Sequence, residues 1–290
     1  MNPEIEVITR QLEAIYARAR GRVAFIDESY KQFSDNQSES FYLVSAVLHK
    51  AENLARDRDA FIRAAQGNWW HTTEAFRLGM DDQIRSMVET VKALSDCTYL
   101  SIHEPIVDGD AETARNRCLL HLLVSLEQLG CWTVILEKRH RRAEQNADAA
   151  LVKSAVAEGL LSKHLKTFQG RPVAEPLLWG PDATCWIMRR ALAVGDFRWL
   201  GSWRRNIQIV ITGAKPSLKA KGPQRSAESG CGPGLPIVPE GEVADRSSYL
   251  SMPFSARVNQ VLHSADIRAI TSPIDDVFLT SWLAANFPRV

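Results

Sequence analysis

Short apolar runs rich in strand-forming residues alternate along this chain with longer segments of helical periodicity, and this alternation most constrains the fold. Residues 22–26 (RVAFI) and 41–48 (FYLVSAVL) are two such runs, and the polar, turn-forming stretch 33–40 lies between them. We therefore expect the chain to open with an antiparallel hairpin. Later apolar runs are separated by segments long enough for helices, which predicts an α/β fold with a mixed sheet and flanking helices.

The same patterns place the other elements. Helices are predicted over residues 4–20, 50–66, 81–94, 110–130, 147–167 and 182–193. Further strands are predicted over residues 98–102, 132–136, 173–177 and 206–212. Residues 69–74 (WWHTTE) are predicted to be irregular or briefly extended. Two short helices are expected near residues 256–263 and 275–286.

The composition changes sharply after the last predicted strand. Residues 1–213 are predicted to form the core domain. Residues 214–249 are rich in Gly, Pro, Ser and Lys, so we expect a linker or long loop there. Residues 250–290 are predicted to form an irregular extension with a helical tail. That tail is expected to dock on the core, or to contact a protein partner or a second copy of the chain.

Charge, cysteine content and motif searches exclude several classes of protein. The net charge is +1, from 35 Lys and Arg against 34 Asp and Glu, which argues against a protein that coats nucleic acid by charge alone. The five cysteines are odd in number and include no CxxC, so neither a disulfide framework nor a zinc finger is expected. No signal peptide or bilayer-length apolar run is evident, which predicts a cytoplasmic protein without membrane segments. The chain has no Walker loop, GxGxxG or GxSxG motif.

Several carboxylates lie at the predicted ends of strands and helices. Asp27 and Glu28 directly follow the first apolar run, Glu137 ends the run 132–136 (WTVIL), and Asp182 lies in the first turn of its helix. Each position also suits a solvated strand end or a favourable helix N-terminal charge. Together, however, such carboxylates suit Mg²⁺, a hard cation that prefers oxygen ligands. We expect Asp27, Glu137 and Asp182 to bind Mg²⁺ or Mn²⁺, with Glu74 or Glu28 as a further ligand, and thereby to cleave phosphodiesters.

Other candidates would act on the substrate. His71 could position a phosphate or shuttle a proton, although a histidine beside two tryptophans is more often packed. Basic side chains near the carboxylates could bind flanking phosphates, or simply form solvated faces. These are Arg139, Arg141, Arg142, Arg189 and Arg190. Trp70 and Trp179 could stack on bases, although core packing is the commoner role.

Several segments together resemble a known family. They are VAFIDES, FYLVSAVL, WWHTTEA, VILEKRHRR and LLWGPDATCWIMRRAL, spread over roughly residues 20–195. They look like a widespread family of bacterial and phage proteins catalogued only as a domain of unknown function, number three-thousand-eight-hundred. The resemblance implies a ribonuclease H-like fold and a suspected nuclease activity.

The resemblance also assigns positions. Asp27 is similar to the first-strand aspartate of the family, and Glu28 follows it as in the family pattern. Asp182 matches the aspartate of the closing helix, and Glu74 falls at an acidic or polar position after a histidine. Glu137 lies where the family often has Asp at the end of the fourth strand, so its side chain is one methylene longer.

Two functions remain open on the sequence. The leading one is a metal-dependent nuclease acting on DNA or RNA. The alternative is a ribonuclease H-like binding or assembly subunit without catalysis, in a phage-defence or mobile-element system. Three features favour this alternative. They are the longer side chain of Glu137, the Gly180-Pro181 pair where the family has an apolar residue and Ala, and the segment 214–249 with the amphipathic tail after it.

Overall fold

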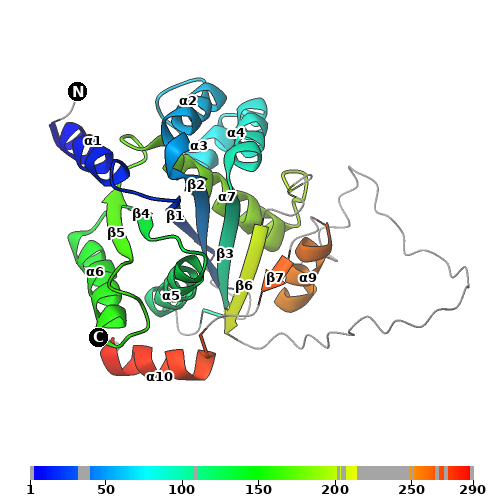
Figure 1. Ribbon diagram of the computed structural model, residues 1–290. Helices are drawn as coiled ribbons and strands as arrows, with labels where there is room; N and C mark the ends of the chain where they lie inside the picture. The colour runs from blue at the N-terminus through cyan, green and yellow to red at the C-terminus, as the bar shows by residue number, and fades with distance from the viewer. Residues whose placement is uncertain are drawn as a thin grey trace, which may run out of the picture.

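The fold is built on a mixed sheet. A computed structural model describes residues 3–31, 40–106, 110–200, 203, 207–213, 249, 251–264, 268–270 and 274–287. These residues include seven strands in the order β5-β4-β1-β2-β3-β6-β7 (Figure 1). The strands are β1 Arg22–Lys31, β2 Phe41–Lys50, β3 Cys97–Glu104, β4 Thr133–Glu137, β5 Lys166–Gly170, β6 Ile207–Gly213 and β7 Arg268–Ile270.

Strand directions divide the sheet into three parts. β1, β2 and β3 form an antiparallel meander, so the predicted opening hairpin is confirmed. β4 and β5 continue the sheet parallel to β1, whereas β6 and β7 continue it parallel to β3. The predicted α/β mixed sheet with flanking helices is therefore confirmed.

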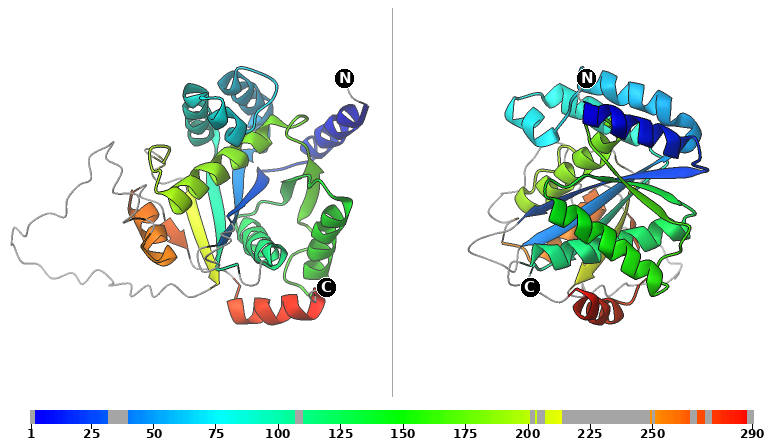
Figure 2. Two further views of the ribbon diagram at one scale, coloured as in Figure 1. Left: turned by 180° about the vertical axis from the view of Figure 1, so that it is seen from behind. Right: turned by 90° about the vertical axis from the view of Figure 1, so that its left-hand side faces the viewer.

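Helices cover both faces of the sheet (Figure 2). One face carries α1 Pro3–Tyr16, α2 Leu54–Ala65, α3 Thr72–Arg77, α4 Asp81–Leu94, α7 Trp179–Val194 and α9 Phe254–Ser264. The other face carries α5 Ala111–Gln128, α6 Arg142–Ala157 and α10 Asp276–Asn286. Short 3₁₀ turns, η2 Ala51–Asn53 and η4 Pro176–Leu178, precede α2 and α7.

Side chains of β1 alternate between two apolar cores. Val23 and Phe25 pack with α2 and α7, whereas Ala24 and Ile26 pack with α5 and α6. This is the period of two that a strand imposes on its side chains. The same alternation continues after Ile26, so the side chains of Asp27 and Glu28 lie on opposite faces of the sheet.

The predicted fifth strand was wrong. It was placed at residues 173–177, but β5 is Lys166–Gly170, and its first two residues fall at the end of the helix predicted at 147–167. α6 ends at Ala157, and Gly159 then adopts a left-handed conformation with φ of 76° that ends the helical path. β5 is a partly exposed edge strand with the sequence KTFQG, so it lacks the apolar run that marks a buried strand.

Three other boundaries differ near the candidate carboxylates. β1 runs on to Lys31, so Asp27 lies within the strand rather than at its end. The segment expected to be irregular at 69–74 becomes helical at Thr72, where α3 begins. α7 begins at Trp179, which places Pro181 inside the first turn, where its missing N–H costs no hydrogen bond.

The C-terminal part adds to the core where it is described. The predicted linker at 214–249 lies outside the described residues except for Tyr249. Both expected tail helices are present as α9 and α10, and α10 packs Leu279, Trp282 and Leu283 into the core beside α5 and α6. No helix in the described ranges combines the length and apolar character that crossing a bilayer requires.

Candidate active site

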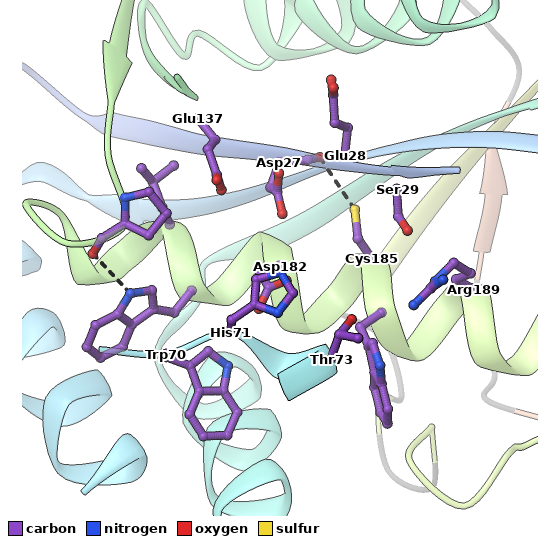
Figure 3. Close-up of a pocket in the computed structure, with 14 residues that line it drawn as sticks. Asp27, Glu28, Ser29, Trp70, His71, Thr73, Glu137, Asp182, Cys185 and Arg189 are labelled. Carbon is purple, nitrogen blue, oxygen red and sulfur yellow. Dashed lines mark hydrogen bonds between the residues drawn. The ribbon is translucent and has the colours of Figure 1, made fainter. Parts of the chain in front are cut away.

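A cavity of about 170 Å³ lies between the sheet and the helices α3 and α7 (Figure 3). Its lining comes from β1, the end of β4, the segment entering α3, and one side of α7. The lining residues are Asp27, Glu28, Ser29, Trp70, His71, Thr73, Glu137, Pro172, Leu178, Trp179, Asp182, Cys185, Trp186 and Arg189. Asp27, Glu137 and Asp182, which are more than 150 residues apart at the extremes, therefore meet at one cavity.

Asp27 and Glu137 come from neighbouring parallel strands. Ile26 of β1 pairs with Leu136 of β4, so the next residue of each strand lies side by side on the same face. Both side chains point toward α7 in Figure 3. The parallel register thus positions two carboxylates on rigid elements.

Asp182 is fixed by α3. Its Oδ2 accepts hydrogen bonds from the backbone N–H of Thr72 at 2.8 Å and from the Thr72 hydroxyl at 2.7 Å. The Thr72 Oγ1 in turn accepts a hydrogen bond from the indole Nε1–H of Trp70 at 2.9 Å. These bonds occupy one oxygen of Asp182 and join the first turn of α7 to the start of α3.

The three carboxylates perturb one another electrostatically. Burial raises the pKa of Asp27 well above its usual range, and the charges of Glu137 and Asp182 raise it further. Burial and the charge of Asp182 raise the pKa of Glu137 to about 7, although a hydrogen bond with Asp27 opposes the shift. Burial also raises the pKa of Asp182, whereas His71 and the bonds from Thr72 lower it. Ionising all three carboxyl groups together is thus unfavourable unless a cation enters the cavity.

Arg189 and Cys185 share the cavity-facing side of α7 with Asp182. The spacing of three and four residues places all three on one helix face. The Cys185 thiol donates to the backbone carbonyl of Asp27 at 3.4 Å and is buried, so burial raises its pKa far from a reactive range. Arg189 makes no ion pair within the described part of the chain, and its buried Nε–H has no hydrogen-bond partner there.

His71 lies at the mouth of the cavity. It precedes the first turn of α3 in an extended conformation, and its exposed ring stacks on Trp69 with centroids 6.4 Å apart. Its charge stabilises the ionised form of Asp182, because it is among the groups that lower the pKa of that carboxyl. The sequence prediction placed His71 near the carboxylates, and it lines the same cavity.

Glu28 borders the cavity, but its side chain points away from the other carboxylates in Figure 3, which corrects its predicted role as a metal ligand. Strand alternation directs its side chain to the opposite face of the sheet, where it pairs with Arg115. Arg115 also pairs with the buried Asp148, and Arg139 lies 3.5 Å from Asp148 and 3.9 Å from Glu28.

The structure also corrects the prediction that Arg139 binds phosphate. Its guanidinium donates to both carboxylate oxygens of Glu112, at 2.8 and 2.9 Å, and Glu144 lies 3.7 Å away. Only 15% of its side chain is exposed, so it is already surrounded by carboxylates on the α5 and α6 face. It has no access to the cavity across the sheet.

Three further candidates lie away from the cavity lining. Glu74 is exposed on α3 and does not line the cavity, which corrects its predicted role as a ligand. Arg190 pairs with Asp196 at 2.7 Å and lies over the Phe76 ring, so it is not available for phosphate. Arg141 and Arg142 are exposed at the start of α6 and do not line the cavity.

Sequence reasoning missed the residues that position the others. Thr72 was not singled out, although it holds Asp182 in place. Cys185 was treated only as one of five scattered cysteines. The spacing of Asp182, Cys185 and Arg189 on one helix was a signal that could have found them together. Nothing in the sequence paired Arg115 with Asp148.

The three carboxylates do not form a closed metal site. In the part of the chain that the structure describes, no set of three or more His, Cys, Asp or Glu side chains already encloses a point where an ion would sit. The three carboxylates share the cavity without converging on one position. Their carboxylate oxygens still fit a hard cation, and they share the cavity with His71, Cys185 and Arg189. In comparisons with known proteins, no family model, curated protein or solved structure matches this chain.

Proposed function

We propose that this protein is a metal-dependent nuclease that hydrolyses phosphodiester bonds in DNA or RNA. One observation carries the proposal: Asp27, Glu137 and Asp182 come from three separate elements and line one cavity. Burial raises the pKa of each, and neighbouring carboxylates raise the pKa values of Asp27 and Glu137 further. Burying like charges together is unfavourable unless a cation compensates them. Such an arrangement is typical of functional sites rather than of packing.

The strand topology supports a ribonuclease H-like assignment. The chain opens with the antiparallel β1–β2 hairpin, and β4 and β5 then extend the sheet parallel to β1 through helical crossovers. This order agrees with the fold that the family resemblance implies for residues 20–195. Asp27 and Glu137 lie on the two strands that this order makes neighbours.

The residues of the cavity have separable roles in the proposed reaction. Asp27, Glu137 and the free oxygen of Asp182 would hold Mg²⁺ or Mn²⁺, which when bound would activate water and stabilise the leaving oxygen. Thr72 keeps the Asp182 carboxylate oriented through its two hydrogen bonds. His71 lies beside the carboxylates and can donate a proton or a hydrogen bond to the departing group.

A cleavage assay tests the proposal. Purified protein is incubated with labelled single- and double-stranded DNA and RNA, with Mn²⁺ or with chelator. We expect cleavage only with metal, and its loss in Asp27→Asn, which keeps the shape of the side chain but removes its charge. Glu74→Gln is the matched control, because it removes an exposed carboxylate outside the cavity and should cleave normally.

Metal binding is measured separately from cleavage. Mn²⁺ should raise the unfolding temperature of the parent protein and of Glu74→Gln, because a ligand that binds only the folded state stabilises it. Asp27→Asn should lose most of that stabilisation. Absence of both cleavage and metal-induced stabilisation would refute the nuclease proposal and favour the non-catalytic binding or assembly subunit.

A further inference from the structure

Arg189 occupies one end of the candidate active site. In Figure 3 its guanidinium lies near the side chains of Ser29 and Thr73, whereas His71 and Trp70 lie toward the other end. The half-buried guanidinium has no ion-pair partner in the described ranges, and its Nε–H is buried without an acceptor. A buried positive charge is unfavourable unless an anion pairs with it.

Two further arginines, Arg190 and Arg77, act electrostatically on Arg189. Burial lowers the pKa of Arg189, and the charges of Arg190 and Arg77 act in the same direction, whereas Cys185 and Asp182 oppose them. Asp196 is paired with Arg190 at 2.7 Å, so its charge is already matched by a cation other than Arg189. The hydroxyls of Ser29 and Thr73 add neutral hydrogen-bond donors to the same end of the cavity. A guanidinium with adjacent hydroxyls is a donor set suited to phosphate oxygens.

The size of the cavity limits what can enter it. At about 170 Å³ it is smaller than the roughly 300 Å³ at which small-molecule pockets usually begin, so it fits a phosphate group rather than a whole nucleotide. The attached base would have to remain outside. At the rim, Trp69 is 52% exposed and stacks on His71, which lines the cavity. An exposed indole can stack on an unpaired base.

We propose that Arg189, with Ser29 and Thr73, forms a phosphate subsite for a single-stranded nucleic acid whose base stacks on Trp69. This inference rests on the proposed nuclease function and assigns its substrate as an unpaired strand. A base within a duplex is already stacked and paired, and its neighbours would prevent it from reaching the indole.

Binding by the full chain tests the subsite without relying on cleavage. Fluorescence anisotropy is measured with labelled 12-nucleotide single-stranded DNA, single-stranded RNA and duplex DNA, in chelator and in Ca²⁺, a further cation that takes oxygen ligands. Arg189→Gln should weaken single-strand binding about tenfold or more and reduce the salt slope by about 0.7. Trp69→Ala should weaken it about 5- to 150-fold.

Two controls separate the subsite from general effects. Lys153→Gln removes the same formal charge from an exposed position on α6 and should bind like the parent. Arg189→Lys keeps the charge without the planar fork, so it should retain the salt slope while losing affinity. The unfolding temperature of Arg189→Gln should not fall, because no ion pair is lost.

The outcomes distinguish the subsite from the nuclease proposal. Unchanged affinity and salt slope in Arg189→Gln, or no binding of any nucleic acid, would overturn the subsite even if the parent protein cleaves. Equal affinity for duplex and single strands, unaffected by Trp69→Ala, would overturn the single-strand assignment. Binding that depends on Arg189 and Trp69 would support the subsite even if no metal-dependent cleavage were found. Comparing the affinities for single-stranded DNA and single-stranded RNA shows which nucleic acid the subsite prefers.

Discussion

Removing Arg115 should destabilise the protein because this side chain neutralises the buried carboxylate of Asp148. The Arg115 side chain is only 4% exposed and pairs with Asp148, which is 2% exposed, and with Glu28, which is 25% exposed. Arg115→Met keeps most of the apolar volume but leaves the Asp148 carboxylate without its nearest cation. Breaking one side of a buried pair typically costs about 3–5 kcal/mol.

Two features of the network place the expected loss near the lower end of that range. Arg139 lies 3.5 Å from Asp148 and retains part of the attraction. Glu28 is partly solvated and has Arg139 at 3.9 Å, so the loss of Arg115 harms it less. We therefore expect a loss of about 3 kcal/mol at pH 7, measured as the free energy of unfolding in urea.

The dependence on pH identifies the cause. Burial already raises the pKa of Asp148 to about 6 in the parent protein, although Arg115 and Arg139 lower it. Without Arg115 the folded-state pKa must rise further, so stability is lost as pH rises from the unfolded value toward the folded one. The penalty of Arg115→Met should thus shrink when the pH falls from 7 to 5. A loss below about 1 kcal/mol, or a loss that does not change with pH, would refute this reasoning.

Three other changes should give measurable effects. Glu137→Gln should make the metal-free protein more stable at pH 8. The folded-state pKa of Glu137 is raised from 4.5 to about 7, so ionising Glu137 destabilises the parent protein as the pH rises through that range, whereas Gln does not ionise. Urea unfolding in chelator at pH 5 and pH 8 measures the difference. Thr72→Val should lower stability by about 1–3 kcal/mol and weaken Mn²⁺ stabilisation, since Trp70 loses its acceptor and Asp182 loses a donor, which calorimetry with and without metal measures. Gly170→Ala should cost about 1–3 kcal/mol in urea unfolding, because its Cβ would lie 2.9 Å from a buried side-chain methyl of the adjacent strand.

The parts of the fold that sequence could predict are those with strong local periodicity. The β1–β2 hairpin and the helix ending near Gln128 have long apolar runs bounded by turn residues, and both are present. β5 could not be read this way, because its five residues lie at an edge of the sheet and include only one large apolar side chain. Its identity is set by pairing with β4, a contact between segments that no local pattern records.

The candidate site divides in the same way. Sequence could suggest Asp27, Glu137 and Asp182 because the first two directly follow apolar runs and the third lies in the first turn of a predicted helix. Once β1 was taken as a strand, alternation alone could have separated Glu28 from Asp27. The roles of the arginines depend on partners far away in the chain. Arg139 is paired with Glu112, whereas Arg189 forms no ion pair among the described residues and acts on Asp182 at longer range.

Adjacent residues of β1 therefore enter two different electrostatic environments. On the α5 and α6 face, Glu28 is held in a network in which each buried carboxylate has a guanidinium within ion-pair distance. On the α7 face, Asp27 meets Glu137 and Asp182, and its pKa rises because burial and like charges act together. A network that is already paired has no need of a ligand, whereas an unpaired one does. Pairing, rather than the number of acidic residues, thus distinguishes the Asp27 face, which carries the candidate site, from the Glu28 face.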